Sequence, residues 1–560
     1  MTRAFLLIGD IGDDVYHVGD EAMFETALAE IASRCDADIT AVTSNPTVVH
    51  DRYGVKAAPL LGFDHRVGSA YDTNRERRLQ EILDGTAADP AAVSMRMAVA
   101  DADGVLVCGG GNLSASWPHL LYERLTLLAL AAQADIPAVL VGQTVGPTLT
   151  GRSAARLTDA FGGAAFVGVR DIPSAQLVRQ LSPEARVLHH EDDAAQLPSA
   201  ARPHELPDRY VAFTVHGNGA DDRVVERYVD FVGHLHATTG LPVVLVPHTG
   251  VLVGPGVPGT DADLMATMAK HHPEAAWLHP LPVHTSTVSA AVLRHAEAVV
   301  SARFHPIVFA LSSGVPCMGL ASGHYTDIKL SGALAHHGMA DWRLPMQSLG
   351  TGAAEALFDE LWQRREELRT HVAVRDSERR AAHTARWDLV VRCLEGHVPE
   401  PDDLSDPPMV AALSPDTVNT DAALTWSEQM QRTIQEYELR ADRSEEYALS
   451  LRDALDQEID ARAHDRREAE HAQALLHAEL AAARDELAQA NWSAAAAREL
   501  AGRLRVALDR GPAVAPPPTS DAAALQRELD AMRNTKLFRW TAPARRLYGR
   551  IRTSGSRRRS

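Results

Sequence analysis

Residues 301–316, SARFHPIVFALSSGVP, bring together three features that favour a negatively charged ligand. Arg303 and His305 are separated by a single residue, so both side chains can point to the same side of an extended segment. Pro306 suits the first turn of a helix, which places the positive end of a helix dipole beside them. A guanidinium, an imidazole and a helix N-terminus together predict a site for a carboxylate or a phosphate. The alternative for a lone histidine is a capping or core role, and the neighbouring Arg303 favours the binding site.

Two more basic residues occupy positions at which a ligand is expected. Arg170 stands at the end of an apolar run, AFVGVR, and ligands of open α/β sheets collect at the carboxyl ends of strands. A solvated arginine, or an ion pair with Asp171, is the competing interpretation. Farther along the chain, the stretch SGHYTDIKL places Tyr325 and Lys329 four residues apart, downstream of the Arg303–His305 pair.

The loop that follows the first apolar run, GDIGDDVYHVGDEA (9–22), supplies carboxylates instead of basic groups. The apolar spacing after it indicates that Asp20 and Glu21 lie in the first turn of a helix. Carboxylates there would repel an anion, but they suit sugar hydroxyls or the acceptance of a proton. The alternative is that Asp20 only caps the helix. The loop carries no GxGxxG motif, so a nicotinamide cofactor has little support.

A second glycine-rich segment, GVLVCGGGNL (104–113), ends an apolar run with three consecutive glycines. Glycine lets the backbone approach a ligand closely, and successive N–H groups can form an anion-binding nest. Gly110, Gly111 and Asn112 are therefore candidate substrate-binding residues. A tight turn in a Rossmann-like domain would explain the glycines without a ligand.

From residue 1 to about 398, apolar runs alternate with amphipathic helical patterns. The strands and helices that they predict must position the candidate site residues. The pattern predicts an α/β fold with two Rossmann-like domains whose doubly wound sheets face each other, at 1–200 and, with closing helices, at 201–398. The break between them is near 198–208. The predicted strands are AFLLIG (4–9), DITAVT (38–43), GVLVCGG (104–110), PAVLVG (137–142), AFVGVR (165–170), YVAFTVH (210–216), LPVVLVPH (241–248), AVVSARF (298–304) and VPCMGL (315–320).

The last third of the chain has a different character. Residues 399–425 are rich in proline and aspartate, which predicts a linker. Residues 426–510 have the apolar spacing of a weak coiled coil through which the chain could form a homo-oligomer, with a long single helix as the alternative. Residues 511–560 contain a proline-rich break and a basic, aromatic tail that suits peripheral contact with an anionic membrane; a disordered solubilising tail is the alternative.

The composition of the 560 residues excludes several classes of protein. A net charge of -19 argues against a nucleic-acid binder, and no apolar run has membrane-spanning length. The N-terminus lacks a signal-peptide pattern, and the four cysteines form no CxxC pair or zinc motif. The expected location is the cytoplasm, with peripheral attachment to the inner face of the membrane through the tail. The cysteines are Cys35, Cys108, Cys317 and Cys393.

These motifs, taken in order, give the chain a resemblance to the polysaccharide pyruvyl transferase family over about residues 5–345. The resemblance rests on the GDEA run near the start and on DADGVLVCGGGNL, then on VGQTVGP (141–147), VGVRDIPS (167–174) and SARFHPIVFALSSGVP (301–316). The family implies a two-domain, GT-B-like arrangement. It also implies transfer of an enolpyruvyl unit from phosphoenolpyruvate to two hydroxyls of a sugar, giving a cyclic pyruvate ketal.

Carried over by motif, the resemblance makes Arg170 and Arg303 donor-binding residues and matches the family's histidine and lysine to His305 and Lys329. The acceptor is expected on the side of domain 1–200, and the donor on the side of domain 201–398. We expect His305 to act as the acid or as a donor to the phosphate, and Asp20 or Glu21 to help deprotonate the acceptor, a sugar or glycan that includes lipid-linked forms. No cofactor and no metal are expected.

Two other functions fit parts of the sequence. A glycosyltransferase that uses a nucleotide sugar would have the same two-domain fold. A non-catalytic scaffold would present the coiled coil to partners, although such a protein has no reason to keep the basic residues and the histidine together.

Overall fold

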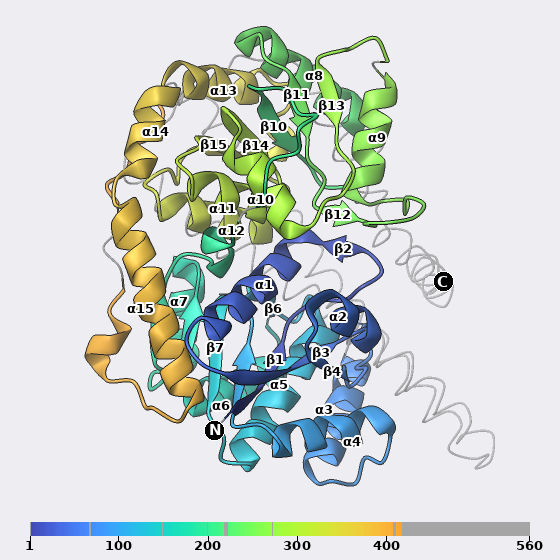
Figure 1. Ribbon diagram of the computed structural model, residues 1–560, viewed down its shortest axis with the longest axis vertical. Helices are drawn as coiled ribbons and strands as arrows, with labels where there is room; N and C mark the ends of the chain where they lie inside the picture. The colour runs from blue at the N-terminus through green and yellow to red at the C-terminus, as the bar shows by residue number, and fades with distance from the viewer. Residues whose placement is uncertain are drawn as a thin grey trace, which may run out of the picture. The chain divides into compact units, whose positions relative to one another are not determined.

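Two β-sheets with helices packed on them form the core of the computed structural model (Figure 1). Every described strand pair within these two sheets is parallel, and each sheet grows outward in both directions from its first strand. This is the doubly wound α/β topology, so the predicted fold class with two Rossmann-like domains is confirmed. The structure describes residues 2–416, apart from 67–68, 148, 199, 218–221, 272 and 407–409.

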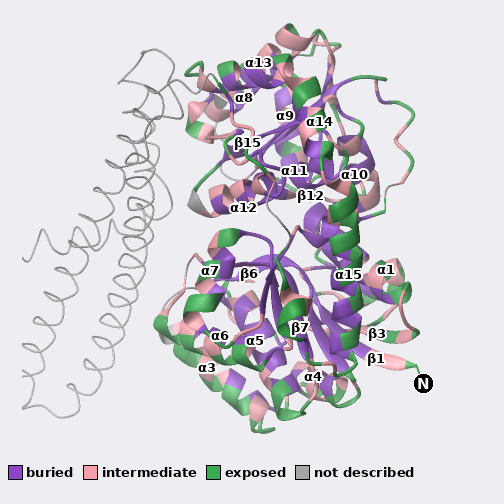
Figure 2. Cartoon of the chain, turned by 90° about the vertical axis from the view of Figure 1, so that its left-hand side faces the viewer, coloured by how far each residue is buried: buried purple, intermediate pink, exposed green. Residues whose placement is uncertain are grey.

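The first sheet grows from β1 (Arg3–Ile8), and its strand order reverses between β1 and β5 (Gly104–Val107). All five apolar runs predicted as strands before residue 171 are strands. They are mostly buried because helices cover both faces of a parallel sheet, as the colouring in Figure 2 shows, and the less buried positions lie toward the start of the runs at 4–9 and 38–43. The other strands are β3 (Ala37–Thr43), β4 (Lys56–Pro59), β6 (Gly110–Leu113), β7 (Ala138–Val145), β8 (Phe166–Val169) and β9 (Val187–His189).

Several helices of this domain begin at residues suited to a helix N-terminus. Asn45, Asp89 and Asp171 each accept a backbone N–H in the first turn of the helix that follows them, and proline stands at the start of each of those helices. The helices are α1 (Val18–Ala32), α2 (Pro46–Tyr53), α3 (Ser69–Leu83), α4 (Pro90–Ala100), α5 (Pro118–Gln133), α6 (Gly151–Gly163), α7 (Ile172–Leu181) and the 3-10 helix η1 (Asp193–Gln196).

The second sheet grows from β10 (Val211–Thr214), and its order reverses between β10 and β14 (Ala298–Ser301). The four runs predicted as strands in this half are all strands. The remaining elements are β11 (Val243–Leu245), β13 (Leu278–Pro280), β15 (Cys317–Ala321), β16 (Arg343–Pro345), α8 (Asp222–Thr239), α9 (Asp261–His271), α10 (Ser286–Arg294), α11 (Phe304–Leu311), α12 (His324–Ala335), η2 (Met346–Ser348), α13 (Ala353–Gln363) and α14 (Arg365–Ala373).

Two features join the halves. A short antiparallel pair links β2 (Tyr16–His17), from the first loop, to β12 (Thr249–Gly250) of the second domain. The helix α15 (Asp376–Leu394) then returns to the first domain, where Trp387 and Leu394 pack in the same apolar cluster as Phe5 of β1. Figure 1 shows α15 running from α14 to the first domain, where it packs against β5 and β7.

The C-terminal predictions lie mostly beyond the described residues. Of the predicted linker, 399–425, the structure describes a 3-10 helix, η3 (Pro401–Leu404), and the segments around it. The predicted coiled coil at 426–510 and the basic tail at 511–560 lie outside the described residues, so oligomerisation and membrane contact stay predictions. Within the described part of the chain, no helix is both long and apolar enough for a membrane crossing. The four cysteines are free.

Candidate active site

Four residues predicted from separate motifs lie in one electrostatic neighbourhood. Arg170 follows β8, Arg303 and His305 begin α11, and Lys329 lies in the second turn of α12. Burial holds the pKa of His305 well below its ordinary value, and Arg170, Lys329 and Arg303 add to the effect. We call these four residues the Arg–His–Lys cluster. It is formed at the carboxyl ends of strands from both sheets, where α/β proteins bind ligands.

Arg170 is buried and held from three sides. Its Nη1 donates to Oδ2 of Asp192 at 2.7 Å, and its Nε donates to the Thr144 hydroxyl at 2.9 Å. The guanidinium also lies 4.3 Å from the centre of the Phe304 ring, which comes from the other domain. The ion pair is therefore with Asp192 and not with Asp171, whose carboxylate caps α7. Among the described residues, Nη2 of Arg170 has no hydrogen-bond acceptor.

Arg303 is the N-cap residue of α11, so the helix begins one residue before the predicted start at His305. Its Nε and Nη2 donate to the two oxygens of Asp261, at 2.9 and 2.5 Å, and Nη2 also reaches the Thr249 hydroxyl at 3.3 Å. Burial alone would raise the pKa of Asp261, but this bidentate pair holds it below its ordinary value. Nη1 of Arg303 has no acceptor within the described part of the chain.

His305 is enclosed, and its Nε2 has no hydrogen-bond partner among the described residues. The nearest carboxylate oxygen is Oδ1 of Asp192, 3.9 Å from Nε2. On its other side the imidazole lies against Gly19 of α1, where a Cβ atom would fall 1.8 Å from Nδ1. The glycine of the GDEA run is therefore required for the close approach of the imidazole. The capping interpretation of His305 fails, because the cap position belongs to Arg303.

The ammonium group of Lys329 loses its proton at a lower pH than an ordinary lysine does. Burial and the nearby Arg170 lower its pKa to about 7, against the effect of Asp20. Its Nζ lies 4.2 Å from the centre of the Tyr325 ring, one helical turn away. No ion pair joins Lys329 to a carboxylate in the described residues. A bound anion would therefore be a favourable partner for this ammonium group.

Asp20 faces the cluster from the first turn of α1. Burial and the neighbouring Asp10 raise its pKa to about 6, while His17, Arg170 and Lys329 act in the opposite direction. His17 Nδ1 lies 3.7 Å from Oδ2 of Asp20, and the aspartate does not cap the helix. A carboxylate with this pKa is mostly ionised at neutral pH and can still accept a proton.

Glu21 points away from the cluster, although it is next to Asp20 in the chain. Its carboxylate accepts the backbone N–H of Gly12 at 3.1 Å and pairs with Arg52 and the Tyr53 hydroxyl of α2. The side chain is 1 % exposed. Of the two carboxylates expected to assist the acceptor, the structure brings only Asp20 to the cluster, and Glu21 ties the first loop to α2.

The predicted glycine-rich loop is partly a strand. Gly110, Gly111 and Asn112 belong to β6, which pairs with β7. The Tyr325 hydroxyl of α12 donates to the Gly111 carbonyl at 3.0 Å, and a Cβ at Gly111 would fall 1.7 Å from that hydroxyl oxygen. The structure therefore explains Gly111 by the close approach of the two domains. Asn112 is partly exposed at this junction.

Sequence reasoning missed the two aspartates that hold the arginines. Asp192 and Asp261 lie 22 and 42 residues from Arg170 and Arg303, so no local spacing connects them. The available signal was the acidic run HHEDD directly after a short apolar run. His216, after β10, was missed as well; burial, together with Arg303, lowers its pKa to about 4.

The described residues contain no group of three or more histidine, cysteine, aspartate or glutamate side chains arranged to hold a metal ion. The charges around the Arg–His–Lys cluster are arranged in pairs. Each arginine is balanced by one buried aspartate and keeps one terminal nitrogen uncommitted, while Lys329 and the uncharged His305 lie beside them. This arrangement can hold a small anion with more than one acidic group.

The family model described as polysaccharide pyruvyl transferase matches residues 17–324, more than half of the chain. This range contains Asp20, Arg170, Arg303 and His305. No curated protein matches the chain significantly in sequence.

Solved structures with a similar arrangement share little sequence with the chain. UDP-GlcNAc 2-epimerase from Neisseria meningitidis, bound to UDP-GlcNAc, is 10% identical with a TM-score of 0.43, over 71% of this chain and 100% of that one. Apo UGT2 from Phytolacca americana is 10% identical with a TM-score of 0.44, over 70% of this chain and 100% of that one.

Proposed function

The chain belongs to the polysaccharide pyruvyl transferase family, a family of enzymes, and we propose that its donor is phosphoenolpyruvate. In this proposal the enzyme transfers the enolpyruvyl unit to two hydroxyls of a sugar in a glycan or glycan precursor. The products are a cyclic pyruvate ketal and inorganic phosphate. No cofactor takes part.

The observation that carries the proposal is the set of uncommitted donors in the Arg–His–Lys cluster. Nη2 of Arg170 and Nη1 of Arg303 have no acceptor in the described residues, and Nε2 of His305 is buried without a partner. Phosphoenolpyruvate carries a carboxylate and a phosphate, and both groups need planar or charged donors. An anion of this kind would supply the missing acceptors and a counter-ion for Lys329.

The first step is addition across the double bond. The methylene carbon of the donor gains a proton, and a hydroxyl oxygen of the sugar bonds to the central carbon as that hydroxyl loses its proton. We assign the hydroxyl proton to Asp20, because its pKa of about 6 leaves it ionised and able to accept a proton at neutral pH. Negative charge on the donor opposes the cations around His305, so the bound donor raises the pKa of this imidazole and lets it deliver the proton.

The second step closes the ring. The bond between the central carbon and the phosphate oxygen breaks, and phosphate leaves with both electrons of that bond. The second sugar hydroxyl bonds to the same carbon and gives its proton to the departing phosphate, which completes the ketal. Arg170, Arg303 and Lys329 stabilise the charge that develops on the departing phosphate. Asn112, partly exposed where the domains meet, is the candidate to bind a sugar hydroxyl.

The test is phosphate release by the full chain from phosphoenolpyruvate in the presence of oligosaccharide acceptors. We expect Arg303→Met to lower kcat/KM by at least about 100-fold, which corresponds to the loss of one charged contact to the developing charge. Arg77→Met is the matched control, because Arg77 is exposed on α3 and contacts Glu81 and Asn74 of the same helix. Equal turnover by both variants would reject the assignment. Turnover and thermal protection by a UDP- or GDP-sugar, with no effect of phosphoenolpyruvate, would show a glycosyltransferase instead.

A further inference from the structure

The segment 191–193, which we call the acidic segment, connects β9 to η1 and lies directly beside the Arg–His–Lys cluster. Its central residue, Asp192, is 3 % exposed. Oδ2 of Asp192 accepts from Arg170 at 2.7 Å, and Oδ1 accepts the backbone N–H of Ala194 at 2.9 Å. Both carboxylate oxygens are therefore committed, and the orientation of the carboxylate is fixed.

The same carboxylate also faces His305. Its Oδ1 lies 3.9 Å from Nε2, the ring nitrogen without a partner, while Gly19 closes the opposite edge of the ring. Arg170, His248, Lys329 and Arg303 all act to lower the pKa of His305, and the Asp192 carboxylate faces the same ring with the opposite charge. One carboxylate thus touches an arginine of the first domain and faces a histidine of the second.

Arg386 of α15 makes two hydrogen bonds to the acidic segment. Its Nη2 donates to Oδ1 of Asp193 at 2.6 Å, and its Nη1 donates to the backbone carbonyl of Glu191 at 3.0 Å. The guanidinium and the Asp193 carboxylate are both buried. Arg386 therefore binds the residues on either side of Asp192 and leaves Asp192 itself to the cluster.

A second contact holds the segment from the other domain. Nε2 of His337, in the loop after α12, lies 2.7 Å from Oε1 of Glu191. The acidic segment is thus fixed by α15 on one side and by the end of α12 on the other. Arg386 and His337 lie outside residues 17–324, the range of the family match.

We propose that Asp192 is a positioning residue for Arg170 and His305, and that Arg386 is the anchor that fixes Asp192. In this proposal α15 packs on the first sheet and, through Arg386, also helps to align Arg170 and His305. The proposal rests on the proposed function for its kinetic readouts, and one further readout is independent of turnover.

The Asp192 variants separate charge from position. Asp192→Asn keeps the shape and removes the charge, so we expect a loss of about 100-fold in kcat, the size expected for a misaligned reacting group. A neighbouring carboxylate favours a protonated imidazole, so its removal lowers the pKa of His305 and moves the alkaline limb of the kcat profile to lower pH. Asp192→Glu keeps the charge at a displaced position. It should lower kcat and leave that limb within about 0.3 pH units of wild type.

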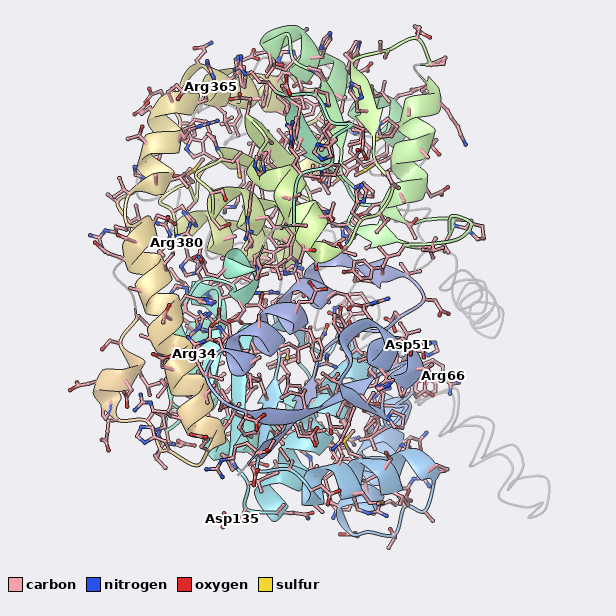
Figure 3. All side chains as sticks on the ribbon, viewed as in Figure 1. Arg34, Asp51, Arg66, Asp135, Arg365 and Arg380 are labelled. Carbon is pink, nitrogen blue, oxygen red and sulfur yellow. The ribbon has the colours of Figure 1, made fainter. Side chains whose placement is uncertain are left out.

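The Arg386 variants test the anchor. We expect Arg386→Met to lower kcat by about 10- to 100-fold with a small change in KM for phosphoenolpyruvate, and Arg386→Lys to restore part of the loss. Arg34→Met is the matched control. Arg34, labelled in Figure 3, also joins α15 to the first domain, through Asp388 at 2.7 Å and the Thr384 carbonyl at 3.1 Å, and it does not touch the acidic segment. It should keep the kcat and the pH profile of wild type even if its melting temperature falls.

Histidine side-chain NMR of the full chain provides the readout that is independent of turnover. With ¹⁵N-labelled histidine, the His305 signal is assigned by its loss in His305→Gln. We expect Asp192→Asn and Arg386→Met to move this signal, and Arg34→Met to leave it in place. An unmoved signal in the first two variants, or wild-type kcat and pH profile in either, would overturn the proposal. If wild type releases no phosphate from phosphoenolpyruvate but the signal moves as expected, the proposed function fails and the positioning role stands.

Discussion

The first turns of α1 and α11 meet at the candidate site, and they treat local electrostatics in opposite ways. α1 places Asp20 and Glu21 at its N-terminus, where the helix dipole favours negative charge. α11 places the cation Arg303 at the same kind of end, where positive charge is unfavourable, with the uncharged His305 beside it. The second arrangement is maintained by buried aspartates that come from distant segments.

The first turn of α1 is explained by its own sequence, whereas the first turn of α11 is not. Both carboxylates of α1 suit their helix position, and one of them is fully used in holding α2. The charge of Arg303 opposes the dipole of α11, and the neighbouring His305 keeps its buried Nε2 without a partner among the described residues. Local conflicts of this kind are expected where a ligand completes the structure.

Separate replacement of the two carboxylates of α1 gives the largest expected contrast. Asp20→Asn removes the proposed proton acceptor and should lower kcat by about 10²- to 10⁴-fold. Burial raises the pKa of Asp20 above its value in the unfolded chain, so the charged form costs stability at neutral pH and the variant should melt no lower than wild type. Phosphate release and thermal melting measure the two effects.

Glu21→Gln should show the reverse pattern. The variant leaves Arg52 beside a buried neutral amide, so we expect the free energy of unfolding to fall by about 3–5 kcal/mol, with most of the kcat retained in the folded protein. Urea denaturation measures the loss. A larger kcat effect for Glu21→Gln than for Asp20→Asn would contradict the division of roles between the two residues.

Gly19→Ala forces α1 and α11 apart. A Cβ at Gly19 would overlap the His305 ring, so the imidazole must move, and we expect kcat to fall by about 100-fold with a stability loss of about 1–3 kcal/mol. Gly233→Ala is the control, because Gly233 lies inside α8 with open space around its Cβ position and should be neutral or stabilising. Wild-type kcat in Gly19→Ala would show that the position of His305 does not matter.

The lowered pKa of Lys329 predicts donor binding that depends on pH. The ammonium group of the free enzyme loses its proton above pH 7, and a bound anion favours the protonated form. The Kd for phosphoenolpyruvate should therefore rise with pH above 7, by at most about tenfold per unit. Isothermal titration between pH 6.5 and 8.5 measures this trend, which should flatten in Lys329→Met. Lys56→Met, at an exposed lysine, is the control.

Tyr325→Phe should have the smallest effect. The variant removes the hydrogen bond to the Gly111 carbonyl but keeps the ring beside Lys329, so we expect a stability loss of about 1 kcal/mol and a two- to fivefold rise in KM for phosphoenolpyruvate. Tyr210→Phe removes a comparable buried bond, to the Val292 carbonyl, inside the second domain. It should lose similar stability with an unchanged KM.

Strand prediction succeeded in the middle of each sheet and failed at the edges. The nine predicted strands are long apolar runs, the signature of strands that are buried on both faces. Among the missed strands, β4, β9, β13 and β16 are three or four residues long and lie at the ends of their sheets. The missed strand β6, which pairs with β7, was predicted as a glycine-rich loop. The two-residue pair of β2 and β12 has no sequence signal, because it forms only where the two domains meet.

The sequence by itself determined the α/β class, the order of the motifs and the chemical types at the site. Arginine, histidine and lysine side chains at the ends of apolar runs are readable in this way because hydrophobic periodicity locates strand ends, and strand ends locate ligands.

Tertiary structure alone decided which charges meet. Nothing local distinguishes Asp20 from Glu21, yet one faces the cluster and the other is buried against α2. The pairing of each arginine with its aspartate, and the return of Arg386 to the acidic segment 193 residues earlier in the chain, depend on contacts between distant segments. Such contacts are set by how the two sheets and α15 pack, and the spacing of residues along the chain carries no record of them.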